Sequence, residues 1–185
     1  IDTCSQIKKS KLHIVVGGQS KLIQSSVKAP RSTNWVLQRK QLGTGHAVKQ
    51  TLPSLRPNSC VVVLLGDGPL VRIKTLKKLI SRTSRDNLSL LTFEASNPKG
   101  LGRIIRQTNS KVVGIVEEKD ASASERKITE VNSGIMATSS KNLKGWLPKL
   151  KNKNAAKEYY LTDVVSCCHN EEKRITAINL GDSEE

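Results

Sequence analysis

Residues 60–67 read CVVVLLGD, and this stretch decides the fold that we expect for the chain. Positions 61–65 are apolar without interruption, so a strand formed here would bury both of its faces. A strand covered on both faces is typical of an α/β sheet with helices on its two sides. We therefore expect a central strand that ends at Asp67.

The flanking segments alternate between strand-like and helix-like patterns. The runs at residues 13–18, 34–38 and 88–93 are β-branched or continuously apolar and predict strands. Apolar positions at helical spacing follow residue 45 and return after Pro69, which favours a helix start. Strand, helix, strand, helix, strand is the pattern of a parallel α/β sheet.

The second half predicts a hairpin and further strands in a mixed sheet. Residues 102–107 and 111–118 flank a polar turn, which indicates a β-hairpin. Residues 128–137 and 174–180 predict two more strands, and residues 158–168 an amphipathic helix. The expected result is one α/β domain over residues 1–185 with a mixed sheet and an inserted hairpin.

Composition excludes several classes of protein. The chain has 185 residues, 36% of them hydrophobic and 25% charged, which is typical of a folded domain rather than a disordered one. The apolar runs are too short to span a bilayer, so no membrane partner is expected. The four cysteines show no zinc spacing, and reduced thiols in a cytoplasmic protein account for them best. There is no signal-peptide pattern, although a chain that opens on Ile1 leaves its true N-terminus open.

The formal charge of +15 attracts phosphates, nucleic acid or anionic lipid. Solvated, lysine-rich helix faces explain the same residues without any function. A nucleic-acid-binding protein is the less favoured interpretation, because aromatic residues make up only 3% of the chain and no docking motif is present.

Topology indicates where chemistry is expected. Ligands of open α/β sheets bind beyond the carboxyl ends of the strands, which selects residues 38–44, residues 66–69, Gly102 and Asn132. Asp67 there is a hard oxygen ligand suited to magnesium held jointly with substrate phosphates. It also suits the cap of the helix expected from Pro69, and the sequence leaves both interpretations open.

Other polar residues likewise have two interpretations. Gly43 and Gly45 allow a backbone to approach a base or phosphate, or simply form a turn at a helix start. His46 is interpreted as a helix-face residue, since no partner is placed by spacing. Glu117 and Asn132 lie in strand-like runs, where they face solvent or bind the hydroxyls of a ligand.

With these segments in order, the chain resembles a known enzyme family. It is similar to the uridylyltransferase domain of the bifunctional N-acetylglucosamine-1-phosphate uridylyltransferase / glucosamine-1-phosphate N-acetyltransferase family. The resemblance covers essentially the whole chain and rests on NWVLQRKQLGTGHAV, LLGDGPLV, GLGRIIRQ, VVGIVEEKDAS, ITEVNSGIMA, KNKNAAKEYYLTDVV and AINLGDSEE. It implies a Rossmann-like nucleotide-diphospho-sugar transferase fold.

The resemblance also implies roles for individual residues. Gln38 and Gly43 match positions that recognise uracil, with Thr44 beside them in the substrate site. Asp67 matches a catalytic magnesium ligand, with Gly66 beside it in the substrate site. The positions that match the sugar pocket are Gly102, Glu117, Asn132, Tyr160 and Thr162.

The implied reaction joins UTP and N-acetylglucosamine-1-phosphate. An oxygen of the sugar phosphate attacks the α-phosphate of UTP, releasing pyrophosphate and leaving UDP-N-acetylglucosamine, a cell-envelope precursor. Such a transfer needs alignment and neutralisation of phosphate charge, here with Mg²⁺, more than it needs a protein nucleophile. That agrees with the absence of a Ser-His or Cys-His pair placed by spacing.

The sequence also departs from the family pattern. The family begins with a strand and a glycine-rich phosphate loop of the form LAAGxGTRM, which the chain does not contain. The acetyltransferase β-helix domain is absent as well, so the resemblance leaves the oligomeric state open. We therefore expect a fold that lacks its first strand and a fragment with impaired stability and activity. A non-catalytic nucleotide-sugar-binding remnant is the alternative function.

Overall fold

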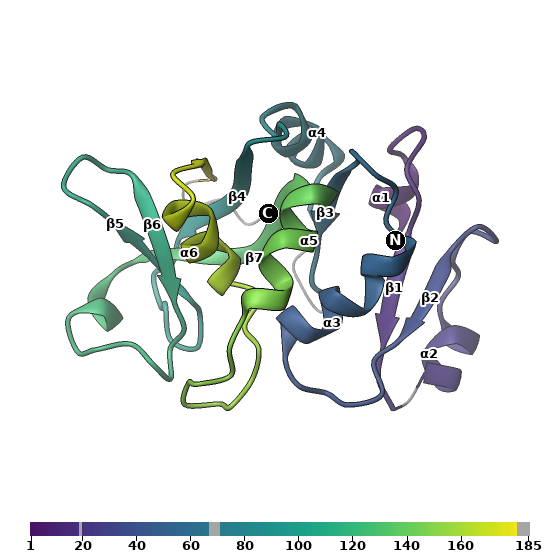
Figure 1. Cartoon of the computed structure of the whole chain (residues 1–185), viewed down its shortest axis with the longest axis horizontal. Helices are drawn as coiled ribbons and strands as arrows, with labels where there is room; N and C mark the ends of the chain where they lie inside the picture. Colours follow the sequence, from purple (N-terminus) through teal and green to yellow (C-terminus); the bar gives the residue numbers. More distant parts are fainter. Residues whose placement is uncertain (19, 67–70, 181–185) are drawn as a thin grey trace.

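The computed structural model describes residues 1–18, 20–66 and 71–180, so Asp67 and Pro69 lie outside the described residues (Figure 1). The first half contains the elements α1 (Asp2–Ser5), β1 (His13–Val16), α2 (Ser20–Ser26), β2 (Asn34–Leu37), α3 (Thr44–Thr51), η1 (Leu52–Ser54), β3 (Cys60–Val63), α4 (Ile73–Ser81) and β4 (Asn87–Glu94). The second half contains β5 (Arg103–Arg106), β6 (Val112–Val116), η2 (Glu125–Lys127), β7 (Glu130–Ser139), α5 (Ser140–Trp146), η3 (Leu147–Lys149), α6 (Asp163–Asn170) and β8 (Arg174–Asn179).

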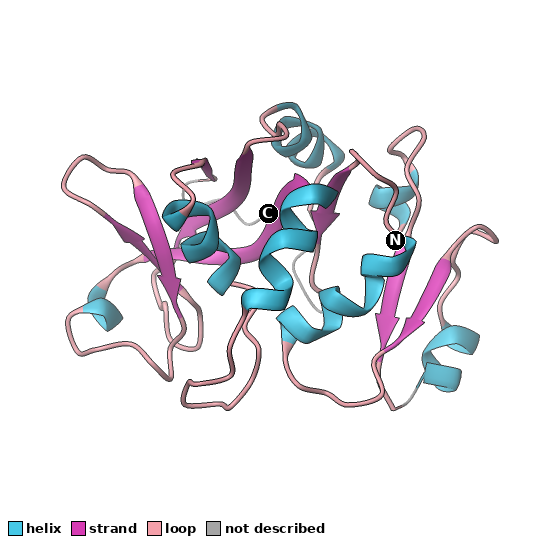
Figure 2. Ribbon diagram, in the orientation of Figure 1, coloured by secondary structure: helices cyan, strands magenta, loops and turns pink. Residues whose placement is uncertain are grey.

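The main sheet is mixed and is built around β7. Its strand order is β6-β5-β7-β4-β8, and β3 also pairs with β7 (Figure 2). The pair β4 and β8 is parallel, whereas β7 runs antiparallel to β3, β4 and β5. The expected mixed sheet and the hairpin of β5 and β6 are therefore confirmed. The strand with the most partners is β7, not the predicted strand after residue 60.

The predicted central strand is shorter and less buried than expected. β3 covers four residues, which are exposed or half-buried. Its side chains nevertheless alternate between two cores: Val61 and Val63 contact one, and Val62 contacts the other. Both faces of the strand are thus covered, as its apolar sequence requires, while its pairing within the described residues is with β7.

The strands β1 and β2 form a separate two-stranded sheet, which the sequence pattern did not predict. They pair in parallel, from His13 with Asn34 to Val16 with Leu37. Figure 1 shows them at the opposite end of the molecule from the hairpin of β5 and β6. Among the described residues no strand joins this pair to the main sheet.

Helices cover both faces of the main sheet. One core lies beneath α3, α5 and α6 and includes the fully buried Trp146. The other core lies beneath α4 and includes Leu76 and Leu79. The strand β7 contributes side chains to both cores, because Met136 packs in the first core and its neighbours Ile135 and Ala137 pack in the second. No helix among the residues described is long and apolar enough to cross a bilayer.

The helix predicted over residues 158–168 begins later than expected. α6 starts at Asp163, so Tyr159 and Tyr160 lie in an irregular segment before it. The reason is tertiary, because the backbone of this segment is hydrogen-bonded to the loop before α3. A peptide group that bonds to a distant segment in this way does not make the corresponding helical hydrogen bond.

Candidate functional site

The first part of the site is the loop between β2 and α3. Gln38 follows β2 directly, and its amide donates to the Val16 carbonyl at 2.8 Å, which extends the pairing of β1 with β2. The Gln38 side chain is buried, and its Nε2 donates to the Gly43 carbonyl at 3.1 Å. Gly43 is the residue before α3 and has φ 104°, a region that favours glycine. Gln38 and Gly43 therefore close the loop upon itself.

A second segment, residues 158–162, is paired with this loop; we call it the strap. The Tyr159 amide donates to the Leu42 carbonyl, and the Gly45 amide donates to the Tyr159 carbonyl, both at 2.8 Å. The Leu161 amide donates to Thr44 Oγ1 at 3.0 Å. The predicted uracil-recognising residues are thus fixed to a segment more than a hundred positions away in the sequence.

The strap also reaches the predicted sugar pocket. The hydroxyl of Thr162, which is buried, donates to Glu117 Oε1 at 2.8 Å. The other carboxylate oxygen of Glu117 lies against Gly102, where an added Cβ would be 3.3 Å from Oε2 and 2.9 Å from Ile115 Cγ2. Only glycine fits this position without displacing its neighbours. Glu117 itself lies just after β6, not within the strand.

Asn132 and Tyr160 complete this part of the site. The Asn132 amide donates to the Gly102 carbonyl at 2.8 Å, and its side-chain oxygen accepts from the Gly134 amide at 3.1 Å. Burial, followed by a hydrogen bond to Asp120, raises the pKa of Tyr160 to about 12. The phenol is therefore neutral at physiological pH.

The structure brings most of the sequence-predicted residues into one set joined by hydrogen bonds or contacts, namely Gln38, Gly43, Thr44, Gly102, Glu117, Asn132 and Thr162. Tyr160 lies in the strap next to Leu161 and is hydrogen-bonded to Asp120 instead. Gly66 is not part of the set: it is exposed, and an added Cβ there would have no atom within 4 Å. Asp67 lies outside the described residues. The individual roles of these residues stay predictions.

An acidic group beside the set was not found from the sequence. Asp163, the first residue of α6, is half-buried, and its pKa is raised by burial and then by the nearby Glu117 and Asp120. The sequence pattern did not indicate this group, because Asp163 lies on α6 whereas Glu117 and Asp120 lie in the turn after β6. Among the described residues, no group of three or more His, Cys, Asp or Glu side chains is arranged to hold a metal ion.

Sequence reasoning also missed the buried Arg103. This side chain follows Gly102, is almost inaccessible to solvent, and donates to the Leu101 carbonyl and to Glu118 Oε2, the latter at 2.7 Å. The hydrogen bond from Arg103 lowers the pKa of Glu118. This ion pair joins the sequence neighbours of Gly102 and Glu117, and so it links the same two segments. Arg103 and Arg106 both flank the apolar pair at residues 104–105, and the pattern does not show which of the two is buried.

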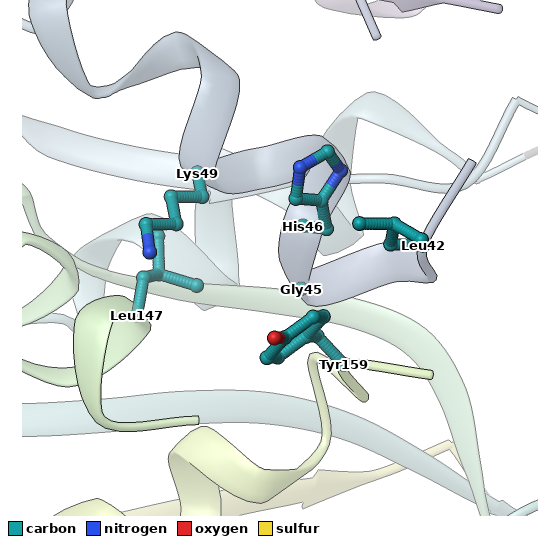
Figure 3. Close-up of a pocket in the computed structure, with 6 residues that line it drawn as sticks. All are labelled: Leu42, Gly45, His46, Lys49, Leu147 and Tyr159. Atoms are coloured by element: carbon teal, nitrogen blue, oxygen red, sulfur yellow. The ribbon is translucent and has the colours of Figure 1, made fainter. Parts of the chain in front are cut away.

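A shallow pocket of about 200 Å³ lies next to the paired loop and strap (Figure 3). Its lining consists of Leu42, Gly45, His46, Lys49, Leu147 and Tyr159. Figure 3 shows Lys49 extending from α3 toward Leu147, whereas the His46 ring and Tyr159 lie on either side of Gly45. None of the predicted substrate residues lines this pocket, although Gly45 and Tyr159 are sequence neighbours of several of them.

The close contact of the loop with the strap predicts a large effect of Gly43→Ala. An added Cβ would lie 2.7 Å from the Tyr159 carbonyl oxygen and 2.9 Å from its amide nitrogen, at a φ that side chains rarely adopt. We expect the free energy of unfolding to fall by about 2 kcal/mol or more, as measured by urea denaturation. Gly145→Ala is the control, because its Cβ would point into open space in α5, and it should be neutral or stabilising. Equal stability of the two variants would contradict this reading of the contact.

Two arginines on one carboxylate provide a second prediction. Arg103 and Arg126 both face Glu118, with 2% and 52% of their side chains exposed, respectively. Arg103→Met removes the hydrogen bonds of a buried guanidinium to the Glu118 carboxylate and the Leu101 carbonyl, and it should lower the free energy of unfolding by about 2 kcal/mol. Arg126→Met should change it by less than about 0.5 kcal/mol, since exposed ion pairs contribute little. Thermal and urea unfolding of both variants measure the difference, and an equal cost would show that burial of Arg103 is unimportant.

Comparison with known proteins gives close matches to part of one enzyme. The chain is 48% identical over 166 residues to the bifunctional protein GlmU of Marinobacter nauticus, a match that covers 90% of this chain and 36% of that protein. GlmU of Cellvibrio japonicus is 46% identical over 166 residues, which again cover 90% of this chain and 36% of that protein. The chain thus spans about a third of the length of these curated relatives. No protein-family model matches it.

A solved structure shows the fold. A putative glucose-1-phosphate thymidylyltransferase from Bacillus anthracis, crystallised in complex with a sucrose, superposes with a TM-score of 0.72 at 18% identity. The superposition covers 96% of this chain and 71% of that one. The fold expected from the sequence is confirmed, and so is the resemblance of this chain to part of the bifunctional GlmU proteins.

Proposed function

We propose that this chain, a relative of part of GlmU with the fold of a sugar nucleotidyltransferase, carries the uridylyl-transfer site of a UDP-N-acetylglucosamine synthase. The substrates would be UTP and N-acetylglucosamine-1-phosphate, and the products UDP-N-acetylglucosamine and pyrophosphate. We place the reaction in the cytoplasm.

The observation that carries the proposal is the connection between the two predicted half-sites. Thr44 bonds to Leu161 in the strap, and the adjacent Thr162 bonds to Glu117. Glu117 in turn contacts Gly102, which is bonded to Asn132. A base-reading loop and a sugar-reading surface joined in this way suit a ligand with a base at one end and a sugar at the other.

The reaction requires the two substrates to be aligned. Gln38 and Gly43 would bind the uracil edge, while Glu117 and Asn132 would bind sugar hydroxyls and the acetamido group. Holding both ends would direct an oxygen of the sugar phosphate at the α-phosphate of UTP, with pyrophosphate as the leaving group. Such positioning converts a bimolecular step into one within a single complex, which supplies much of the rate.

Magnesium would neutralise phosphate charge during the transfer. We propose Asp67 as its protein ligand, because a carboxylate is the hard oxygen donor that magnesium prefers. Asp67 lies outside the residues that the structure describes, and the proposal for it rests on the chemistry of its carboxylate alone. The site residues described here are assigned to binding and orientation only.

The proposal predicts binding of UDP-N-acetylglucosamine and a selective loss in Thr162→Val. This change removes the hydroxyl that holds Glu117 while keeping the side-chain shape. Affinity for UDP-N-acetylglucosamine should fall about tenfold by calorimetry, the equivalent of about 1.4 kcal/mol, whereas affinity for UDP should be unchanged.

Thr129→Val is a matched control, because Thr129 donates to Glu94 at 2.8 Å away from the site. It should bind both ligands as the unchanged protein does. A protein that binds neither ligand would contradict the proposed function. Binding without release of pyrophosphate from UTP, N-acetylglucosamine-1-phosphate and magnesium would instead identify the alternative, a non-catalytic nucleotide-sugar binder.

A further inference from the structure

We propose that His46 determines which base the site accepts, because it holds the Gln38 carboxamide in a single orientation. The inference rests on the proposed function, in which Gln38 contacts the base. It assigns to His46 a positioning role that its place on the face of α3 does not suggest.

The orientation of the Gln38 carboxamide follows from its partners. The Gly43 carbonyl can only accept a hydrogen bond, so the atom 3.1 Å from it is the amide nitrogen. The same nitrogen lies 2.9 Å from His46 Nδ1. An amide nitrogen has two hydrogens, and here one is donated to the Gly43 carbonyl and the other to His46 Nδ1. The group that Gln38 can offer to a ligand is therefore its oxygen, an acceptor.

This arrangement also fixes the tautomer of His46. Nδ1 must accept from Gln38, so in the neutral ring the hydrogen is on Nε2. The Gln50 amide nitrogen lies 3.1 Å from that Nε2, and the ring cannot accept from both amides at once. Gln38 is buried, whereas Gln50 is half-buried and also donates to the His46 carbonyl at 3.1 Å. Leaving the buried N–H unpaired costs more, about 1–3 kcal/mol, so the hydrogen bond with Gln38 takes precedence.

Packing keeps the His46 ring in place. Its centroid lies 6.3 Å from that of Tyr159, with the rings tilted by 33°. Figure 3 shows the ring on α3 close to Leu42, with Tyr159 on the other side of Gly45. Both neighbours belong to the paired loop and strap, so the pairing that builds the site also positions the acceptor for Gln38.

An acceptor facing the base selects its hydrogen-bonding edge. Uracil carries a hydrogen on N3 and can donate to the Gln38 oxygen. Cytosine has an unprotonated N3, which is itself an acceptor and would face the oxygen without a hydrogen between them. Turning the amide over to suit cytosine would break the bonds to Gly43 and His46 together. Without His46 only one bond opposes that rotation, so discrimination should weaken.

The test compares UDP and CDP binding to the 185-residue chain by calorimetry. His46→Leu removes the acceptor, and we expect the preference for UDP over CDP to fall about tenfold. His46→Asn places an acceptor oxygen near the position of Nδ1 and should keep the preference within about twofold. Gln50→Leu, which removes the other contact of the ring, should bind as the unchanged protein does.

The side-chain amide of Gln38 provides a second readout that does not depend on ligand binding. In ¹⁵N-labelled protein its two hydrogens should both be protected from exchange, and His46→Leu should expose one of them. An unchanged UDP preference in His46→Leu, or unchanged protection, would overturn the inference while leaving the proposed function standing. If the protein without substitutions binds UDP and CDP equally, or binds neither of them, the inference about His46 and the proposed function are both overturned.

Discussion

The site depends on one interaction, the pairing of the loop before α3 with the strap at residues 158–162. Backbone hydrogen bonds join Tyr159 to Leu42 in the loop and to Gly45 in the first turn of α3, and the Leu161 amide donates to the Thr44 hydroxyl in that same turn. Gly43 is required because any side chain there would strike the strap backbone. Through this contact the end of the β1 and β2 sheet is fixed to the main sheet, although no strand among the described residues joins the two.

The main sheet supplies the other wall of the site through β7. This strand pairs with β3, β4 and β5, and so the position of Asn132 is set from both sides. The hairpin of β5 and β6 then brings Gly102 against Glu117, and the adjacent buried Arg103 is bonded to Glu118. Gly102, Glu117 and Asn132, which we propose to bind the sugar, therefore lie on regular strands or next to them, whereas Gln38 and Gly43, which we propose to bind the base, lie on a loop. A rigid wall and a loop fastened to it are an arrangement suited to aligning two substrates.

Local pattern predicted much of the fold but not the contacts that build the site. The hairpin, the mixed sheet and the helices on both faces follow from apolar periodicity and turn residues, which are short-range signals. The late start of α6 does not, because Tyr159 gives up helical bonds for bonds to a distant loop. Arg103 and Asp163 were missed for a similar reason, since their partners lie on other segments. The resemblance named the residues of the set, and the structure shows how most of them are connected.

Hydrogen exchange measured amide by amide tests the central claim most directly. If one ligand spans the loop and the main sheet, UDP-N-acetylglucosamine should slow exchange at the Gly45, Tyr159 and Leu161 amides, which carry the pairing, and also at the Asn132 amide. All four should slow together. Slowing confined to Gly45, with Tyr159, Leu161 and Asn132 unchanged, would show that the pairing does not unite the two halves and would contradict the account.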